Sequence, residues 1–309
     1  MFPPDRSMNK SPLFSVLIAN YNNGRFLQEA IDSVLGQTFP DWEVIIVDDA
    51  STDDSPSIYE KYASDGRFRF YRNEKNSGCG FTKRKCIELA EGELCGFLDS
   101  DDALMPNALE VMVGAHAEHP ECSLIYSTCY RYSGDKDADM PIWDFIGPIP
   151  EASDFLIFRK RLVSHFVSFK KAYYNRTVGI DRTLLCAEDR DLYYKLEEVG
   201  KLLHLPVPLY YYRVNNVNSV SIGTEEKDIR AHHYSVCAEL NAICRRMGGP
   251  LYKRNKKAYL EYMRVLLKVY YHSTLYRRSA FMRYCWFYLR GYAFSPHACS
   301  HLLKIVRGV

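Results

Sequence analysis

The chain has 309 residues, of which 47% are hydrophobic and 25% are charged, and its formal net charge is +2. This apolar content is enough for one large core, or for one core and a smaller partner, which excludes a disordered protein. No apolar run reaches the length of a membrane span, and the N-terminal stretch MFPPDRSMNKSP lacks the apolar core of a signal peptide, so we expect a cytosolic protein.

The first part of the chain alternates between predicted strands and predicted helices. Short runs rich in branched apolar residues predict strands at 14–20, 43–49, 67–73, 93–100 and 123–132. Between them, one predicted helix carries the apolar stripe Leu27, Ile31, Val34 and Leu35, and three more are expected at 54–64, 80–91 and about 106–118. This alternation predicts an α/β fold, with a mostly parallel sheet and helices on both of its faces.

The middle of the chain is less regular. Residues 133–165 contain prolines and glycines and are predicted to form a long loop, a kind of segment that is often functional. A helix is predicted at 184–200. A strand follows at 204–213, and we expect it at a sheet edge because it contains prolines.

Ten cysteines are spread along the chain without any Cys-x-x-Cys pair. This spacing argues against a zinc cluster and favours buried thiols in a reducing compartment.

Polar or acidic residues stand where several predicted strands end: Asn20 and Tyr21, Asp48 and Asp49, and Asp99 and Asp101. Ligands of parallel sheets bind outside the carboxyl ends of the strands. We therefore expect these positions to converge on one site.

The stretch CGFLDSDDALMP (95–106) places Asp99, Asp101 and Asp102 within four positions. One interpretation is a solvated turn in which Asp102 caps the next helix. The other is a site in which Asp99 and Asp101 hold Mg²⁺ or Mn²⁺ together with phosphate oxygens. The three carboxylates alone do not decide between them.

The segment IIVDDASTDDS (45–55) also has two interpretations. Residues 51–53 are suited to capping the next helix. An acid at a strand end can also accept hydrogen bonds from a base or a ribose hydroxyl.

The segment NSGCGFTKRKC (76–86) is a glycine turn that opens a helix. It fails the dinucleotide-binding fingerprint because Lys83 occupies the third glycine position, which argues against an NAD-linked oxidoreductase. The helix start carries Lys83, Arg84 and Lys85, which either face a diphosphate or form a solvated basic face.

The segment CAEDRDLYYKL (186–196) begins a predicted helix with Glu188, Asp189 and Asp191. Acids are favoured at a helix N-terminus by the helix dipole alone. The alternative is that one of them is a general base that faces a cleft.

Four segments in order resemble the family 2 glycosyltransferases, inverting enzymes of the GT-A fold that use nucleotide sugars. They are FSVLIANYNNGRFLQEAIDSVLGQTFPDWEVIIVDDASTDDS, NSGCGFTKRKCIELAEGELCGFLDSDDALMP, AEDRDLYYKLEEVG and LYYYRVNNVNSVS. The resemblance spans about residues 12–222, and its most specific part is SVLGQTFPDWEVIIVDDASTD.

The resemblance implies roles for the residues that bind the donor. Asp49 matches the acid that contacts the nucleotide base, with Ala19 and Tyr21 lining the same pocket. Asp99 matches the first acid of the family's Asp-x-Asp pair, near the ribose. Asp101 matches the second, at a Mn²⁺ or Mg²⁺ ion.

The resemblance also implies how the reaction is carried out. Asp189 matches the catalytic base, and Arg213 matches a basic residue in a segment that closes over the donor. Lys83 is the candidate contact to the diphosphate. An inverting transfer needs one base to deprotonate the acceptor hydroxyl and positive charge to neutralise the leaving diphosphate.

The C-terminal part of the chain is strongly basic. Residues 251–309 contain 12 lysines and arginines and a single acid, Glu261, a net +11, so residues 1–250 carry about −9. Leu260, Met263, Leu267 and Tyr270 form an amphipathic helical stripe. The segment is either a helical appendage on the sheet or a helix pair at an anionic membrane surface, the interpretation we prefer. Nucleic acid is a less favoured partner, because no recognition motif accompanies the charge and the main domain is acidic.

Together these observations predict a domain at residues 1–222 and a helical basic region at 223–309. The predicted activity is metal-dependent, inverting glycosyl transfer. The donor is a nucleotide sugar, with UDP preferred, and the acceptor is a saccharide or lipid-linked glycan of a surface polysaccharide such as lipopolysaccharide. We expect the acceptor near Trp143 and His165, and the protein in the cytoplasm or peripheral on the inner face of the membrane. A non-catalytic nucleotide- or glycan-binding module of the same fold is the alternative.

Overall fold

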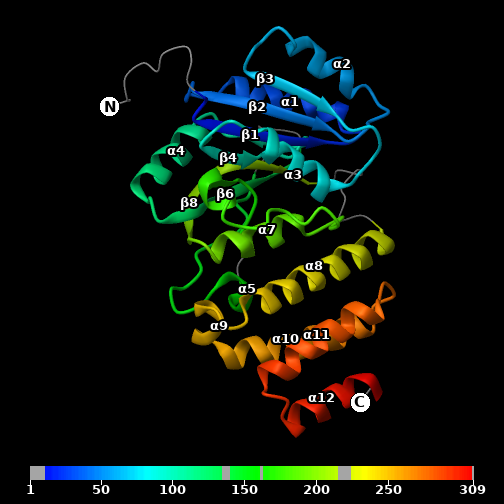
Figure 1. Ribbon diagram of the computed structural model, residues 1–309. Coiled ribbons are helices and arrows are strands. Elements are labelled where there is room, and N and C mark those ends of the chain that lie inside the picture. Colours follow the sequence, from blue (N-terminus) through cyan, green and yellow to red (C-terminus); the bar gives the residue numbers. More distant parts are fainter. Residues whose placement is uncertain (1–10, 134–139, 161–162, 215–223, 308–309) are drawn as a thin grey trace.

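The computed structural model describes residues 11–133, 140–160, 163–214 and 224–307 (Figure 1). The strands are β1 (Phe14–Asn20), β2 (Trp42–Asp48), β3 (Phe68–Arg72), β4 (Leu94–Phe97), β5 (Ala103–Leu104), β6 (Cys122–Tyr132), β7 (Val167–Lys170) and β8 (Lys201–Arg213). The helices before β8 are α1 (Gly24–Leu35), α2 (Ser55–Tyr59), the 3₁₀ helix η1 (Glu60–Tyr62), α3 (Cys79–Leu89), α4 (Ala108–Glu118), α5 (Phe155–Phe158), α6 (Lys171–Tyr174) and α7 (Glu188–Glu197). Those after it are α8 (Glu225–Arg246), α9 (Pro250–Arg254), α10 (Lys256–Tyr271), α11 (Arg278–Gly291) and α12 (Pro296–Arg307).

The strands form one sheet in the order β3-β2-β1-β4-β7-β6-β8-β5. Strands β1 to β4 are parallel to one another, and β6 and β8 are parallel to each other. Strand β7 runs antiparallel to β4 and β6, and β5 runs antiparallel to β8. The predicted mostly parallel α/β sheet is therefore confirmed. Its two reversed strands were not predicted, because β5 has two residues and β7 four, too few to show a periodic pattern.

The central strands form because their apolar runs are buried. Strand β1 occupies 14–20 as predicted, and Val16, Leu17 and Ile18 are inaccessible to solvent. Fully burying one such side chain is worth about 1.5–3 kcal/mol. In α1, Leu27, Ile31 and Val34 are buried as predicted, whereas Leu35 is 38% exposed.

Three other predicted elements differ in detail. The helix expected at 54–64 is α2 followed by η1, and the predicted loop at 133–165 contains α5. Strand β8 begins at Lys201, and it lies between β6 and β5 rather than at the end of the sheet. However, β5 pairs only with Tyr210 and Tyr211, so within the described residues the part of β8 that holds its prolines is paired on one side alone.

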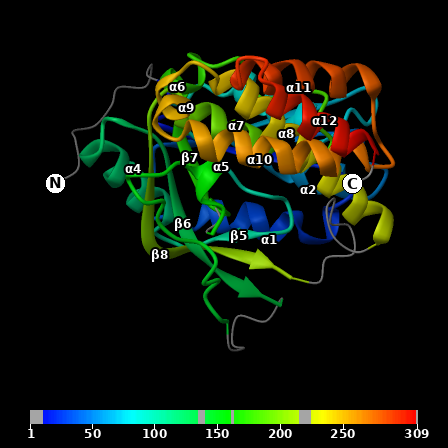
Figure 2. The same cartoon turned by 90° about the horizontal axis from the view of Figure 1, so that it is seen from below.

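The C-terminal helices form a separate layered stack. Figure 1 shows α7 beneath the sheet, α8 beneath α7, α10 and α11 next, and α12 at the bottom. In Figure 2, which is seen from below, α10, α11 and α12 lie in front of the sheet. The predicted stripe of Leu260, Met263, Leu267 and Tyr270 is buried inside this stack. Within the described residues, no helix combines the length and the apolar character needed to cross a bilayer.

A buried ion-pair network joins the stack to the sheet domain. The Arg246 side chain, at the end of α8, is 1% exposed and contacts Asp154 at 3.2 Å, Glu197 at 2.8 Å and Glu198 at 3.1 Å. Tyr259 of α10 accepts from Arg246 at 3.0 Å and donates to Asp154 at 3.0 Å. The joint is therefore polar, and each of its buried charges is paired.

Candidate active site

The acidic turn, residues 99–102, follows β4 at its carboxyl end. The main-chain N–H of Asp99 donates to Tyr210 Oη at 3.1 Å. The Asp102 carboxylate accepts from the main-chain N–H of Arg213 at 2.7 Å, and burial together with Asp101 and Asp99 raises the pKa of Asp102. The expectation that Asp102 caps the next helix is wrong, because α4 begins at Ala108 with Asn107 as its N-cap residue. Asp102 instead holds the turn against β8.

Lys83 brings the acidic turn and the start of α7 together. Its ammonium lies 3.4 Å from Asp99 and 3.0 Å from Glu188. Burial alone would lower the pKa of Lys83, but the surrounding carboxylates, Asp99 foremost, raise it well above its usual value. Lys83 therefore keeps its charge, and it offsets part of the negative charge of this acidic edge.

Asp189 lies in the first turn of α7, next to the buried Glu188. Burial and the charge of Glu188 raise the pKa of Asp189, and Lys83 opposes the shift. Tyr193, one turn further along, is buried, and burial together with Asp189 raises the pKa of its hydroxyl. Asp189 is thus a carboxylate with raised proton affinity, a property that suits a general base.

Asp49 is buried at the end of β2, where it fixes the glycine turn before α3. Its carboxylate accepts from the main-chain N–H groups of Ser77 and Gly78 and from the Asn73 amide, each at 2.8 Å. Gly78 has φ of +88°, a conformation that favours glycine. Lys85 donates to the Asn73 side chain at 2.9 Å, which completes the cluster.

Two basic residues of α3 do not follow either expectation. Arg84 donates to Glu88 at 2.9 Å and to the carbonyl of Ile180 at 3.0 Å, and it is half-buried. Lys85 is held by Asn73. The idea of a solvated basic face is wrong for both, and neither lies with Lys83 at the acidic turn.

The end of β1 lies beside the end of β2, because the two strands are paired in register from Phe14 to Asn20. Ala19 is half-buried there, and Tyr21, just past the strand, is 46% exposed. The main-chain N–H of Asn22 donates to Ser51 Oγ at 2.9 Å, which ties this edge to the segment after Asp49.

Arg213 lies at the end of β8 and is 8% exposed. Its guanidinium pairs with Glu29 and donates from Nε to the main-chain oxygen of Asp101 at 2.7 Å. It also lies over the rings of Phe26 and Tyr132, 4.4 and 4.7 Å from their centroids. In this arrangement Arg213 positions the acidic turn.

Asp99 and Asp101 suit a cation that is shared with a ligand. The Asp99 side chain is 47% exposed, and Asp101 is half-buried. Among the described residues no group of three or more His, Cys, Asp or Glu side chains is arranged to hold a metal ion by itself. Mg²⁺ usually takes one or two carboxylates and completes its shell with phosphate oxygens and water, so this sparse donor set fits such a site.

An aromatic group lies beside the acidic turn. His165 stacks on Tyr212 with ring centroids 3.9 Å apart, and Trp143 lies 5.1 Å from His165. Burial lowers the pKa of His165 to about 4, so its ring is neutral at physiological pH. His165 Nε2 is buried without a hydrogen-bond partner among the described residues. His165 also stacks on Tyr210, with ring centroids 6.2 Å apart, and the Tyr210 hydroxyl accepts from the main-chain N–H of Asp99, so these aromatic residues lie at the acidic turn.

Glu188 and Tyr210 received no assigned role from the sequence. Glu188 pairs with Lys83 and accepts from the thiol of Cys79 at 3.1 Å. Tyr210 lies in a run of three tyrosines in β8, and nothing in that pattern marks which of them reaches Asp99. Both contacts depend on tertiary pairing.

The chain matches a family model and several curated proteins. A model described as Glycosyl transferase family 2 matches residues 15–180. A chondroitin synthase of Escherichia coli is 32% identical over 254 residues, which cover 80% of this chain and 35% of that protein. A hyaluronan synthase of Pasteurella multocida is 30% identical over 228 residues, covering 72% of this chain and 23% of that protein. The chain thus spans about a third or less of these relatives.

Solved structures share the fold. The S. aureus TarS fragment 1–349 in complex with UDP superposes with a TM-score of 0.60 and 20% identity, covering 96% of this chain and 88% of that one. The mannosyltransferase PcManGT from Pyrobaculum calidifontis, in complex with GDP-Man and Mn²⁺, gives a TM-score of 0.60 and 18% identity over 96% of this chain and 80% of that one. At such identities the likeness shows the fold alone, and the expected GT-A fold is confirmed.

Proposed function

Because the chain belongs to glycosyl transferase family 2, we propose that it transfers a sugar, with inversion, from a nucleotide sugar to a saccharide or lipid-linked acceptor. The observation that carries this proposal is the double contact of Lys83 with Asp99 and Glu188. These two contacts join the acidic turn to the start of α7. The two acidic segments are about 90 residues apart in the sequence. The relatives named for chondroitin and hyaluronan synthesis support a role in building polysaccharide.

Asp189 acts as the general base in this proposal. It removes the proton from the acceptor hydroxyl, whose oxygen attacks the anomeric carbon of the donor sugar. In the same displacement the bond from that carbon to the diphosphate oxygen breaks, so configuration is inverted and no covalent sugar–enzyme intermediate forms. The raised pKa of Asp189 supports the role, because a more basic carboxylate accepts the proton more readily.

The donor lies along the carboxyl edge of the sheet. Ala19, Tyr21 and Asp49 surround the base, and Asp99 contacts the ribose. The leaving diphosphate gains its positive partner from Lys83. UDP is the preferred nucleotide, and the TarS structures with UDP and with UDP-GlcNAc support that choice.

Asp101, with Asp99 beside it, would hold Mn²⁺ or Mg²⁺. When bound, the ion would neutralise charge on the leaving diphosphate. Arg213 keeps Asp101 in place through its bond to the main-chain oxygen. The PcManGT complex with GDP-Man and Mn²⁺ supports a metal in a protein of this fold.

The acceptor binds over Trp143, His165 and Tyr212. Aromatic faces suit the apolar faces of sugar rings, and His165 and Tyr212 stack on each other here with Trp143 beside them.

Residues 1–222 form the transferase domain in this proposal, and residues 223–309 form the helical region. The protein acts at the cytoplasmic face of the membrane, with the helical region peripheral to the bilayer. All ten cysteines lie in the described residues and no disulfide links any of them, which supports a reducing compartment.

The direct test is nucleoside diphosphate release from a panel of nucleotide sugars, with saccharide acceptors and Mn²⁺. We expect Asp189→Asn to lower turnover by about 10²–10⁴-fold while donor binding persists. Asp101→Ala should remove the Mn²⁺-dependent part of donor binding. Unchanged release in both variants would contradict these roles. Donor binding without turnover on any acceptor, in the unaltered protein, would instead favour a non-catalytic binding module.

A second assay tests the acceptor position. Trp143→Ala should raise the acceptor KM by about 3–10-fold and leave the donor KM unchanged, since it removes one stacking surface. Phe145→Ala is the matched control, because Phe145 lies in the same loop and is 61% exposed. Equal effects of the two substitutions on the acceptor KM would rule out a specific platform at Trp143.

A further inference from the structure

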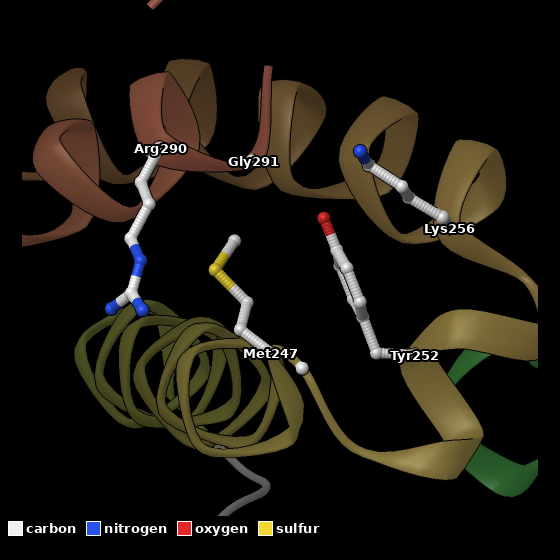
Figure 3. Close-up of a pocket in the computed structure, with 6 residues that line it drawn as sticks. Met247, Tyr252, Lys256, Arg290 and Gly291 are labelled. Carbon is white, nitrogen blue, oxygen red and sulfur yellow. The ribbon is translucent and has the colours of Figure 1, made fainter. Parts of the chain in front are cut away.

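A hollow of about 180 Å³ lies in the helical stack, at the junction of α8, α9, α10 and α11 (Figure 3). We call it the C-terminal hollow, and its lining residues are Met247, Gly248, Tyr252, Lys256, Arg290 and Gly291. None of them belongs to the candidate active site. The hollow therefore needs an explanation of its own.

The Tyr252 hydroxyl faces this hollow without a partner. Tyr252 is 6% exposed, and among the described residues its Oη has no hydrogen-bond partner. The Tyr252 ring packs edge-on against Tyr259, with ring centroids 5.5 Å apart. Its hydroxyl lies close to Gly291, since a Cβ added at Gly291 would be 3.1 Å from Oη. Figure 3 shows the hydroxyl directed into the space between Gly291 and Lys256. A buried hydroxyl without a partner is costly, so its position points to a ligand that completes it.

Two cations also line the hollow, Lys256 and Arg290, and Figure 3 shows the Met247 side chain between Arg290 and Tyr252. Lys256 is the first residue of α10, and Arg290 lies in the last turn of α11. Neither has an acidic partner among the described residues, and the one acid of this region, Glu261, lies 3.9 Å from Lys257. Burial raises the pKa of Tyr252, so its hydroxyl keeps its proton and can donate. The three polar side chains of the hollow are therefore all hydrogen-bond donors, two of them charged, an arrangement that selects an anion.

The size of the hollow selects the kind of anion. One water takes about 30 Å³ in the liquid, so the hollow accommodates a group of about six waters. Pockets for whole drug-sized ligands measure roughly 300–1,000 Å³, which excludes a complete nucleotide sugar. A phosphate or diphosphate group fits, and the planar fork of an arginine matches its oxygens.

We propose that the C-terminal hollow is a phosphate-binding site, with Tyr252, Lys256 and Arg290 as its ligands. The helix that carries Arg290 also bears exposed apolar side chains: Met282 and Trp286 precede Arg290 by eight and four residues on α11, and are 59% and 49% exposed. The Arg290 guanidinium lies 5.4 Å from the Trp286 ring centroid. Exposed apolar and basic side chains on one helix suit the phosphate of an anionic lipid headgroup at a bilayer surface, and a free phosphate shares the same polar chemistry.

The first arm of the test uses free anions. Thermal unfolding of the full chain is followed against inorganic phosphate and pyrophosphate, at constant ionic strength and with EDTA, so that no cation recruits the anion to the acidic turn. The unaltered protein should show a melting temperature that rises with anion concentration, by a few degrees at saturation. The double variant Lys256→Gln/Arg290→Gln should lose that rise. The control Lys253→Gln/Arg278→Gln, which removes the same charge outside the hollow, should keep it.

Tyr252→Phe separates a ligand from a structural role. If the hydroxyl serves an anion, the variant should be at least as stable as the unaltered protein without phosphate, and it should gain less from phosphate. A lower melting temperature without phosphate, and an undiminished gain with it, would overturn the role of Tyr252.

The second arm uses vesicles of phosphatidylcholine with and without phosphatidic acid. If the ligand is a headgroup, the unaltered protein and the control variant should co-sediment with the acidic vesicles, and the hollow variant should co-sediment several-fold less. A phosphate-dependent stabilisation without any difference on vesicles would identify a soluble phosphate as the ligand of the same site. Equal losses in the hollow and control variants would show diffuse charge alone, and no response in either arm would also overturn the proposal.

Discussion

The acidic turn and the C-terminal helices use charge in opposite ways. At the turn, the half-buried Lys83 contacts both Asp99 and Glu188, and the surrounding carboxylates raise the pKa of Lys83 well above its usual value. In residues 251–307 the basic side chains mostly point to solvent, and the pair of Lys257 with Glu261 is 3.9 Å long and exposed. Charges held together at low dielectric can tune proton affinity, whereas charges spread over a surface attract or repel partners.

In the acidic region, the ionised form of Asp189 is destabilised by folding. Burial and the charge of Glu188 raise the pKa of Asp189, so the ionised form is less favourable in the folded chain than in the unfolded one. The stability that protonated Asp189 contributes is fully present below its ordinary value of 3.8 and is lost as pH rises through the raised value. At neutral pH the ionised carboxylate therefore costs stability and serves chemistry.

The largest expected effect comes from Asp189→Asn. Transfer should fall by about 10²–10⁴-fold, and the acid limb of the activity profile should start above the range of an ordinary aspartate in the unaltered protein. Melting temperature measured against pH should show the variant equal to or above the unaltered protein at pH 7. The advantage should disappear below pH 4. If Asp189→Asn is less stable than the unaltered protein at pH 7, neighbouring groups stabilise the ionised Asp189 carboxylate in the folded chain.

The next effect breaks the joint between the two regions. Arg246→Ala leaves Asp154, Glu197 and Glu198 without their common partner and should lower the free energy of unfolding by about 3–5 kcal/mol. Lys257→Ala removes an exposed pair and should change it by less than about 0.5 kcal/mol. Urea unfolding measures both. Similar losses of unfolding free energy in the two variants would mean that burial of an ion pair does not decide how much it contributes to stability.

The smallest effect tests the close approach that builds the acidic edge. An added Cβ at Gly80, in α3, would lie 2.6 Å from the carbonyl oxygen of Leu184 and 2.8 Å from that of Asp181. Gly80→Ala should therefore cost about 1–3 kcal/mol and move Lys83 away from Glu188. At Gly114, in α4, nothing lies within 4 Å, so Gly114→Ala should stabilise by about 0.5–1 kcal/mol. Thermal unfolding separates the two. A neutral Gly80→Ala would show that the 181–184 segment can shift.

Much of the sheet could be predicted because its signals are local. The run FSVLIAN predicted a strand with the bounds that β1 has, since a strand covered on both faces is rich in consecutive apolar residues. Strand β7 was missed because four residues paired between β4 and β6 carry no local pattern of their own. The pairing partner, not the residue pattern, makes VSFK a strand.

The candidate site shows the same division. The acidic positions 49, 99 and 189 could be selected from strand ends and a helix start. The contacts of Asp102, Arg84 and Lys85 could not be predicted, because each side chain has its partner in another element or loop: Arg213, Ile180 and Asn73. Their charges indicated polar partners without indicating which.

The sequence by itself determined the fold class, the parallel strands and the chemical types gathered at their ends, because strand and helix formation depend on neighbouring residues. Only the tertiary structure decided that Lys83 lies between Asp99 and Glu188, that Arg246 joins the two regions, and that the Tyr252 hydroxyl faces a hollow. The physical reason is that ion pairs and desolvation depend on distance through space, which the order of residues along a chain does not specify.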